Sequence, residues 1–199
     1  MAMNRAAFKK MLVSIRQANE VACLIHYARI FTKHYPEDYY GWAVLGDGLT
    51  DFASYQEADA ALKRALRLAP EYRVGAVCAL IGHLHREKGD HVRAEKWYRR
   101  AIKEDGPNTL NLVILGGCLA KQGKFQEAKQ CHRKAIKLAS DPVDEAFFNL
   151  GLVLRAEGRL QQAADNFRKS LEIDPKYPPA KRALKDVEKV LALKKKKKS

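Results

Sequence analysis

Residues 42–70 read WAVLGDGLTDFASYQEADAALKRALRLAP, and the spacing of small and large residues in this stretch returns along the chain. Gly46 is followed twelve residues later by Ala58 and sixteen residues later by Leu62. The same order returns three times, at Gly82, Ala94 and Tyr98, at Gly116, Ala128 and His132, and at Gly151, Ala163 and Phe167. Successive glycines lie 36, 34 and 35 residues apart. A period of this length predicts a stacked array of similar structural units.

Each unit has the pattern of two helices joined by a tight turn. Gly89, Gly123 and Gly158 stand after the first helices, where glycine adopts the left-handed cap conformation at little cost, and Ala53 takes that place in the first unit. The second helices are predicted at residues 55–68, 91–103, 125–138 and 160–173. Because a glycine inside a helix costs about 1 kcal/mol against alanine, its return at one register predicts a close crossing of the paired helix. Without hairpin or alternating-strand signals, the chain is predicted to be all-α.

These residues resemble the tetratricopeptide repeat over about residues 38–175. The first unit carries Trp42, Gly46, Ala58, Leu62, Ala65 and Pro70, and the third and fourth units follow the same signature. The second unit departs from it, with Cys78 at the first aromatic position and His85 and Tyr98 at the larger positions. The resemblance implies a right-handed α-α superhelix, a solenoid of four units at residues 37–72, 73–107, 108–142 and 143–175.

The two ends are predicted to close this solenoid. Residues 1–36 have the pattern of a degenerate helical repeat that caps the N-terminal side. Residues 176–193 are expected to form a capping helix with an apolar stripe at Ala180, Leu184, Val187 and Leu191. Residues 194–199 are expected to be a disordered lysine tail, because five like charges in a row repel one another.

The resemblance also implies where a partner binds. In this family the first helices of successive units line a concave groove that holds a peptide or a helix of another protein. The corresponding positions here are Tyr40, Ala43, Asp47, Ala79, His83, Arg86, Val113, Gly117, Lys121, Phe148, Asn149, Leu152 and Arg155. Small and apolar residues dominate the middle of this set, which suits an apolar or amphipathic helical ligand. The alternative is that the protein's own terminal helix, or tight packing, fills part of the strip.

One known use of the family is a clamp in which lysine, asparagine and arginine hold the acidic C-terminal tail of a chaperone. Ala43 and Asp47 stand where the clamp has lysine and asparagine, and Leu110 and Ile114 stand where it has lysine and arginine. The sequence therefore argues against that clamp. The chain is predicted to be a non-enzymatic scaffold or adaptor that binds another protein, with self-association through exposed repeat ends as a further interpretation.

The chain is strongly basic, with a formal net charge of +14. The predicted convex helices carry Lys96, Arg99, Arg100, Lys103, Lys129, Arg133, Lys134 and Lys137. A run of five lysines follows, made of Lys194, Lys195, Lys196, Lys197 and Lys198. The alternative function is therefore a polyanion-binding protein, for nucleic acid or an anionic membrane, that uses this face and the tail. Nucleic acid is the less favoured ligand because exposed aromatic residues do not alternate with the cations.

No pattern in the sequence indicates catalysis, a cofactor or a metal site. His83 and His85 are two residues apart and point to different faces of one helix, and His132 occupies a packing position. The four cysteines form no Cys-x-x-Cys pair and are expected to be reduced and buried. Without a run of 18 apolar residues or a secretory signal, the expected location is the cytoplasm.

Overall fold

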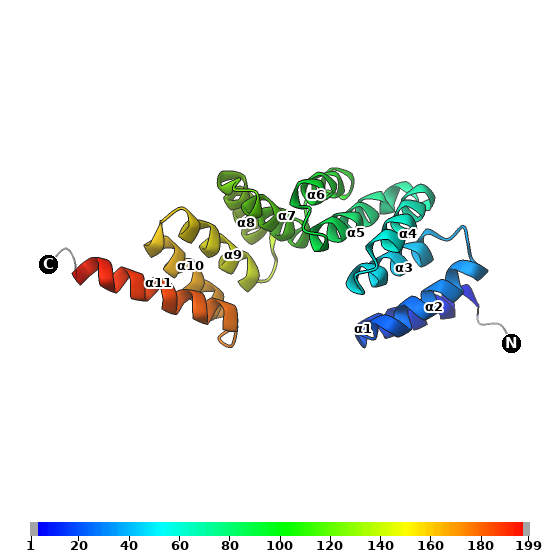
Figure 1. The fold of residues 1–199 in the computed structure, drawn as a ribbon, viewed down its shortest axis with the longest axis horizontal. Coiled ribbons are helices and arrows are strands. Elements are labelled where there is room, and N and C mark those ends of the chain that lie inside the picture. Colours follow the sequence, from blue (N-terminus) through cyan, green and yellow to red (C-terminus); the bar gives the residue numbers. More distant parts are fainter. Residues whose placement is uncertain (1–3, 197–199) are drawn as a thin grey trace. The chain divides into compact units, whose positions relative to one another are not determined.

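The computed structural model describes residues 4–196, with side chains as far as Lys194, and these residues form helices and no β-strand (Figure 1). The all-α prediction is confirmed. The chain divides into two compact units, Met1–Gly106 and Pro107–Ser199. The first unit contains α1 (Arg5–Gln17), α2 (Val21–His34), α3 (Tyr39–Asp51), α4 (Tyr55–Leu68), η1 (Glu71–Arg73), α5 (Val74–Glu87) and α6 (His91–Asp105). The second contains α7 (Thr109–Lys121), α8 (Phe125–Leu138), α9 (Asp144–Ala156), α10 (Leu160–Ile173) and α11 (Pro178–Lys196).

Three of the four second helices, α4, α8 and α10, have the predicted bounds. The helix α6 runs two residues further than predicted, to Asp105, and ends at Gly106, whose φ is +80°. The glycine spacing of 36 residues between the first and second repeats is two residues longer than the next spacing, and a single 3₁₀ turn, η1, precedes α5 there.

The recurring glycines lie where paired helices cross. A Cβ atom on any of them would lie within 3 Å of the large side chain sixteen residues later, closer than such atoms approach one another in proteins. An added Cβ would lie 2.5 Å from Leu62 Cγ at Gly46 and 2.9 Å from Tyr98 Cε2 at Gly82. It would lie 2.5 Å from His132 Cε1 at Gly116 and 2.6 Å from Phe167 Cε1 at Gly151. The predicted reason for the repeated glycine, a close approach of the paired helix, is confirmed.

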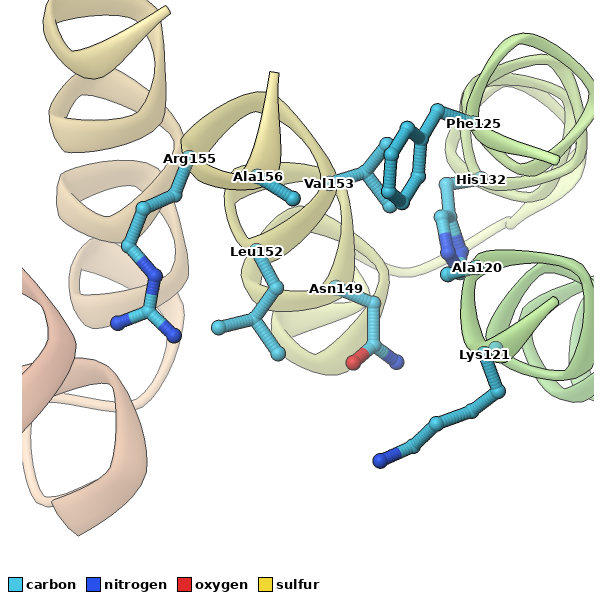
Figure 2. A pocket seen from close by; sticks show the side chains of 10 residues that line it. Ala120, Lys121, Phe125, His132, Asn149, Leu152, Val153, Arg155 and Ala156 are labelled. Carbon is cyan, nitrogen blue, oxygen red and sulfur yellow. The ribbon is translucent and has the colours of Figure 1, made fainter. Parts of the chain in front are cut away.

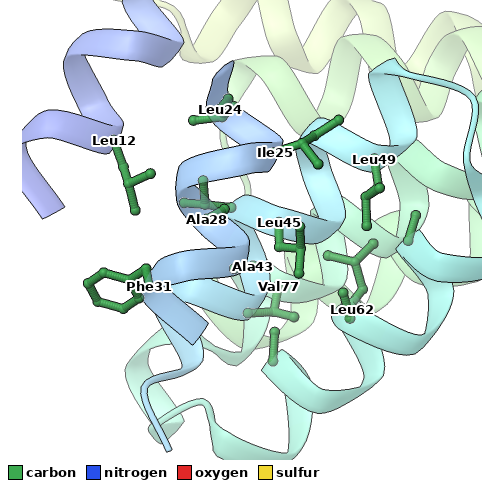
Figure 3. Close-up of a cluster of buried hydrophobic side chains, with 14 of the residues drawn as sticks. Leu12, Leu24, Ile25, Ala28, Phe31, Ala43, Leu45, Leu49, Leu62 and Val77 are labelled. Carbon is green, nitrogen blue, oxygen red and sulfur yellow. The ribbon is translucent and has the colours of Figure 1, made fainter. Parts of the chain in front are cut away.

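In the N-terminal helix pair, α1 and α2, the large residue stands on the first helix and the small residue on the second. At the positions that hold glycine and the large residue elsewhere, this pair has Leu12 and Ala28, sixteen residues apart and both fully buried. Figure 3 shows them in the core of the first unit, near Phe31. Because a leucine on one helix needs a small residue on the other, the exchange keeps the helices packed while removing the sequence signature. The assignment of residues 1–36 as a degenerate repeat stays a prediction.

The turn after α3 has an alanine where the other three turns have a glycine. Ala53 has a φ of +60°, in the region where Gly89, Gly123 and Gly158 stand at 75° to 76°. The Ser54 N–H donates to the Leu49 carbonyl at 2.8 Å, so the cap is closed as in the other turns. An alanine at such a φ is strained because its Cβ crowds the backbone.

We expect Ala53→Gly to raise the free energy of unfolding by about 0.5–1 kcal/mol, because relief of the left-handed strain outweighs the added freedom of the unfolded chain. Urea denaturation followed by circular dichroism measures the change. Gly123→Ala is the matched reverse substitution: no atom lies within 4 Å of the added Cβ, so its cost is conformational only. An unchanged midpoint for both variants would contradict the strain at this position.

The C-terminal helix α11 covers the last repeat. Its residues Ala183 and Val187 are buried in a core that includes Phe167, and Ala180 is also buried. The helix runs to Lys196, three residues beyond the predicted end, so part of the predicted lysine tail is helical. Residues 197–199 lie outside the described residues, and with them the rest of that tail.

Candidate functional site

The second compact unit, residues 107–199, contains an open pocket of about 240 Å³ on the face predicted to bind a partner. It is lined by ten residues, of which Gly117, Lys121, Asn149, Leu152 and Arg155 belong to the set predicted from the sequence. The other five are Ala120, Phe125, His132, Val153 and Ala156. The side chains come from α7, α8 and α9 (Figure 2). The structure therefore gathers five sequence-predicted residues around one hollow.

The rim of this pocket is basic and polar, and its floor is apolar. Figure 2 shows Leu152 and Asn149 between the side chains of Arg155 and Lys121. Lys121 and Arg155 are exposed, whereas Asn149 and Leu152 are half-buried. Within the described part of the chain, Lys121, Arg155 and Asn149 make no hydrogen bond or ion pair with another side chain. Their polar atoms are therefore free to bind a ligand.

Gly117 gives the pocket its depth. The neighbouring Gly116 is needed for helix packing, but a Cβ on Gly117 would meet no atom within 4 Å. The space above Gly117 is thus open, and a side chain added there would enter it.

His132 forms the buried wall of the pocket. It is fully buried, its ring lies against Gly116, and neither ring nitrogen has a hydrogen-bond partner. Burial lowers the pKa of His132 to about 4, so the imidazole is neutral at neutral pH. The prediction that His132 is a packing residue is confirmed. Sequence reasoning missed its place beside the pocket. Whether one side of the ring faces a pocket depends on how the next repeat packs, and the residues near His132 in the sequence do not show this.

Two predicted groove residues of the second unit are not available as expected. Val113 is only 3% exposed and belongs to the core. Phe148 is half-buried and packs against Phe167 and Tyr177, with ring centroids 5.8 Å and 5.2 Å apart. Because Tyr177 immediately precedes α11, the chain's own C-terminal segment covers part of the strip. The accessible apolar surface formed by the predicted residues is therefore narrower than the sequence indicated.

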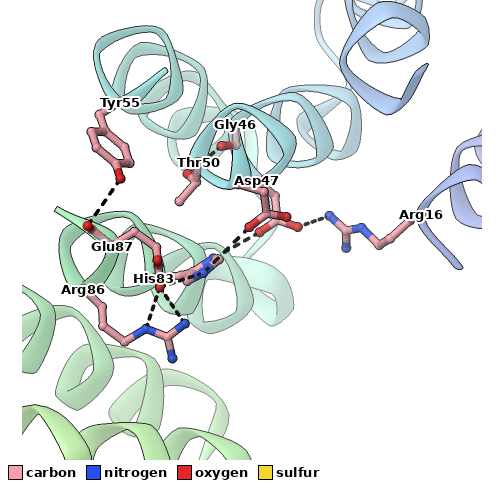
Figure 4. Close-up of polar contacts among 9 residues, drawn as sticks. Arg16, Gly46, Asp47, Thr50, Tyr55, His83, Arg86 and Glu87 are labelled. Carbon is pink, nitrogen blue, oxygen red and sulfur yellow. Dashed lines mark hydrogen bonds and ion pairs between the residues drawn. The ribbon is translucent and has the colours of Figure 1, made fainter. Parts of the chain in front are cut away.

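The corresponding face of the first unit is polar and internally paired (Figure 4). Asp47 accepts from Arg16 of α1 and lies 3.5 Å from His83 Nδ1. His83 Nε2 lies 3.5 Å from Glu87, whose carboxylate also accepts from Arg86. Sequence reasoning missed Arg16, because the degenerate first repeat gives no register from which to transfer its position.

The remaining predicted groove residues of the first unit differ in exposure. Ala43 is 7% exposed and so belongs to the core, whereas Ala79 is half-buried. Tyr40 is half-buried beneath the Lys9 ammonium, which lies 5.0 Å from the ring centroid, and burial raises the pKa of its hydroxyl. This face offers a ligand few free polar groups.

Acidic groups on this face are close enough to affect one another. Burial, and then the neighbouring Asp47, raise the pKa of the Asp51 carboxyl. His83 Nε2 lies 3.9 Å from that carboxyl. The described residues nevertheless contain no group of three or more His, Cys, Asp or Glu side chains arranged to hold a metal ion.

Several of the cations predicted to form a basic surface are buried or paired with carboxylates. Lys129 is buried, with its side chain 4% exposed, and its ammonium lies 2.6 Å from Glu157 Oε2. Arg99 and Arg100 of α6 are paired with Glu95 and Glu104. The prediction that Lys129 belongs to the basic face of the alternative function is therefore wrong, because a carboxylate from the turn after α9 pairs with it inside the fold. Of the predicted lysine tail, Lys197 and Lys198 lie outside the described residues.

The cysteines carry free thiols, and two of them are buried. All four cysteines are reduced thiols, as expected, and Cys78 and Cys118 are buried. Cys23 of α2 is exposed, so the expectation of burial is wrong for that residue. No helix among residues 4–196 combines the length and the apolar character that crossing a bilayer requires.

Comparison with known families decides what this repeat is. Two family models, each described as tetratricopeptide repeat, match residues 44–109 and residues 108–176, so together they span most of the chain. The chain belongs to the tetratricopeptide repeat family. The matched region begins within α3 and ends after α10, so the tetratricopeptide repeats carry the pocket described above.

Two relatives of the chain are much longer proteins. A TPR repeat-containing protein of Methanocaldococcus jannaschii is 28% identical over 136 residues, which are 68% of this chain and 24% of that protein. A probable UDP-N-acetylglucosamine–peptide N-acetylglucosaminyltransferase, SPINDLY of Petunia hybrida, is 33% identical over 100 residues, which are 50% of this chain and 10% of that protein. This tetratricopeptide repeat chain thus spans a quarter or less of each.

A solved structure agrees with the fold. YrrB, described as a TPR protein with an unusual peptide-binding site, aligns with a TM-score of 0.69 and 19% identity, covering 92% of both chains. At this identity the likeness shows the fold and not the ligand. The tetratricopeptide repeat fold is generally that of a protein-binding scaffold.

Proposed function

We propose that this tetratricopeptide repeat protein is a non-enzymatic scaffold that holds a peptide or an amphipathic helix of another protein in the second unit. The proposal depends on one observation: an open pocket lies at positions that the family's binding mode assigns to the ligand. Pockets that bury a drug-sized molecule usually have at least about 300 Å³, and this one has about 240 Å³. It therefore suits one or two side chains of a polypeptide better than a whole small molecule.

The lining supports a polypeptide ligand. Leu152, Ala120 and Ala156 supply apolar surface, and the half-buried Asn149 supplies one amide that can pair with a peptide backbone. YrrB, which has the same fold, is itself described as having a peptide-binding site. No described residue of the pocket is a nucleophile with an adjacent general base, which is consistent with binding without catalysis.

We expect Gly117→Leu to weaken partner binding about tenfold or more while leaving the fold intact. The added side chain enters the open space above Gly117 and occupies the pocket, and a leucine in place of a helical glycine favours the helix by about 0.5–1 kcal/mol. Loss of binding would therefore come with an equal or higher unfolding midpoint. Quantitative affinity capture from the native cell, with the full chain as bait, measures the binding.

Gln130→Leu is the matched control, because it adds the same side chain to an exposed position of α8 outside the pocket. Proteins captured by the wild type and by Gln130→Leu, but lost with Gly117→Leu, are the expected result. If both variants retain the same set of proteins, the pocket is not the binding site and the proposed function at this site is wrong.

A further inference from the structure

We propose that the first compact unit, residues 1–106, binds a nucleotide in an open pocket formed by α4, α5 and α6. The base would lie against Trp97, and the phosphate beside Lys88 and Arg93. A free mononucleotide and one unit of a single strand of RNA share this chemistry. The pocket has about 350 Å³, and sites that bury a small molecule begin at about 300 Å³. This site is separate from the peptide pocket of the proposed function, which lies in the other compact unit.

Three helix faces meet at this pocket. Its lining residues recur three or four positions apart on each helix, so those of one helix share a face. The nine are Tyr55, Gln56, Asp59 and Lys63 of α4, Ile81, His85 and Lys88 of α5, and Arg93 and Trp97 of α6. The Tyr55 hydroxyl donates to the Glu87 carbonyl at 3.3 Å and so joins α4 to the end of α5 (Figure 4). Because an α-helix turns once in 3.6 residues, the predicted groove residues His83 and Arg86 lie on the opposite face of α5.

His85 gives this pocket a hydrogen-bonding group that the fold does not use. It is 8% exposed, its Nδ1 is fully buried, and no residue within 4–194 forms a hydrogen bond with its ring. Burial lowers the pKa of His85, and so do Lys88 and Arg93, against the opposite effect of Asp90, so the imidazole is neutral at neutral pH. A neutral imidazole has one donor and one acceptor nitrogen, and the edge of a nucleobase offers both kinds of partner. Since nearly all buried polar groups in proteins are paired, the ring favours a ligand with hydrogen-bonding atoms.

Trp97 supplies an aromatic surface beside the cations. Its indole is half-buried and lines the pocket, and the Arg100 guanidinium lies 5.5 Å from the ring centroid. Proteins commonly hold unpaired bases by stacking them on aromatic side chains, with cations along the phosphates. The order of the sequence did not show this combination, because the aromatic residues and the cations come from three helices.

The charge of the lining favours an anion. Three of the lining residues are cations, Lys63, Lys88 and Arg93, and one, Asp59, is a carboxylate. Lys88 makes no ion pair with another residue of the described chain. Lys63 pairs with Asp59, and Arg93 with Asp90, but in both pairs the cation is largely exposed, so the pairing contributes little and leaves the cation able to bind a ligand. A phosphate monoester has nearly two charges and several acceptor oxygens, so it suits more than one of these cations.

Tryptophan fluorescence tests the inference, because the chain has two tryptophans and only Trp97 lines the pocket. In the full chain with Trp42→Phe, the tryptophan emission comes from Trp97 alone. The probes are the four ribonucleoside 5′-monophosphates, with free tryptophan amide as the correction for their absorption. We expect saturable quenching of Trp97 by the nucleotides. Adenosine, which lacks the phosphate, and ribose 5-phosphate, which lacks the base, should each bind at least about tenfold more weakly than adenosine monophosphate, which corresponds to about 1.4 kcal/mol.

Variants at the pocket assign the contacts. Lys88→Gln and Arg93→Gln should each weaken adenosine monophosphate about tenfold and leave adenosine unchanged. His85→Leu should weaken both, because it removes the partner of the base and not that of the phosphate. Lys103→Gln is the matched control: it removes one exposed charge from α6 outside the pocket and should have no effect. Circular dichroism checks that each variant is folded, and the exposed positions of Lys88 and Arg93 make these two independent of packing.

A single-stranded RNA of six adenylates separates the two sources of the ligand. If it binds at least about tenfold more tightly than the mononucleotide and still depends on Lys88, the ligand is a strand, whereas equal affinity identifies a free nucleotide. The inference is overturned if neither the nucleotides nor the RNA quench Trp97 in a saturable way, or if adenosine binds as well as its monophosphate. A loss with Lys103→Gln as large as that with Lys88→Gln would also overturn it, because the attraction would then be a general effect of charge. None of these results bears on the peptide pocket, which Gly117→Leu tests separately.

Discussion

Glu157→Ala is expected to lower the free energy of unfolding by about 3 kcal/mol, because it leaves a buried ammonium without its carboxylate. Lys129 Nζ lies 2.7 Å and 2.6 Å from the two oxygens of Glu157, and the Lys129 side chain is 4% exposed. The loss of one partner of such a pair is costly because the remaining charge is desolvated and unpaired. The cost stays at the lower end of the known range because Glu157 is 16% exposed, so solvent is near.

Urea denaturation with circular dichroism measures the change, and amide hydrogen exchange of α8 and α9 locates it. Lys129→Met combined with Glu157→Gln should recover most of the loss, since an apolar side chain of similar length fills the space without a charge. The matched control is Glu188→Ala, which breaks the Arg168–Glu188 pair, whose side chains are 44% and 49% exposed. An exposed pair contributes less than about 1 kcal/mol. Equal losses for Glu157→Ala and Glu188→Ala would refute the assignment of Lys129 as a buried charge.

The fold was predictable from the sequence because its determinants are local and repeated. Gly116 and His132 are sixteen residues apart, and their contact reappears at the same spacing in each of the four units. The N-terminal helix pair could not be recognised by its glycine. Leu12 and Ala28 stand at the positions of the glycine and the large residue, so the large side chain is on the first helix and the small one on the second. Helix ends were predictable where glycine or proline fixed them, and α11 ran past its predicted end because no such residue stops it.

The site was predictable only in part, because exposure depends on contacts between repeats. The positions of Gly117, Leu152 and Arg155 followed from the register, and these residues do line one pocket. The burial of Val113 and the covering of Phe148 by Tyr177 did not follow, since both depend on how neighbouring elements pack. Lys129 shows the same limit for charge: its carboxylate partner is 28 residues away, in another repeat.

His132→Phe is expected to raise stability in acid far more than at neutral pH. The pKa of His132 is about 4 in the folded chain and about 6.5 in the unfolded chain. Above pH 6.5 both states are neutral at this residue, and the histidine causes no pH dependence. Between pH 6.5 and about 4 the unfolded chain binds a proton that the folded chain does not, so the free energy of unfolding falls with falling pH. The total loss reaches about 3 kcal/mol near pH 4 and grows little below it.

Phenylalanine removes the titrating group and fits the same setting, since the Phe167 ring packs over Gly151 as the His132 ring packs over Gly116. The two buried nitrogens without partners disappear at the same time, which adds stability at every pH. The measurement is the difference in free energy of unfolding between wild type and variant at pH 7 and at pH 4.5, which cancels the titration of the carboxylates common to both. If His132→Phe gives the same change at both pH values, the folded chain binds the proton as readily as the unfolded one, and the ring is not held neutral by burial.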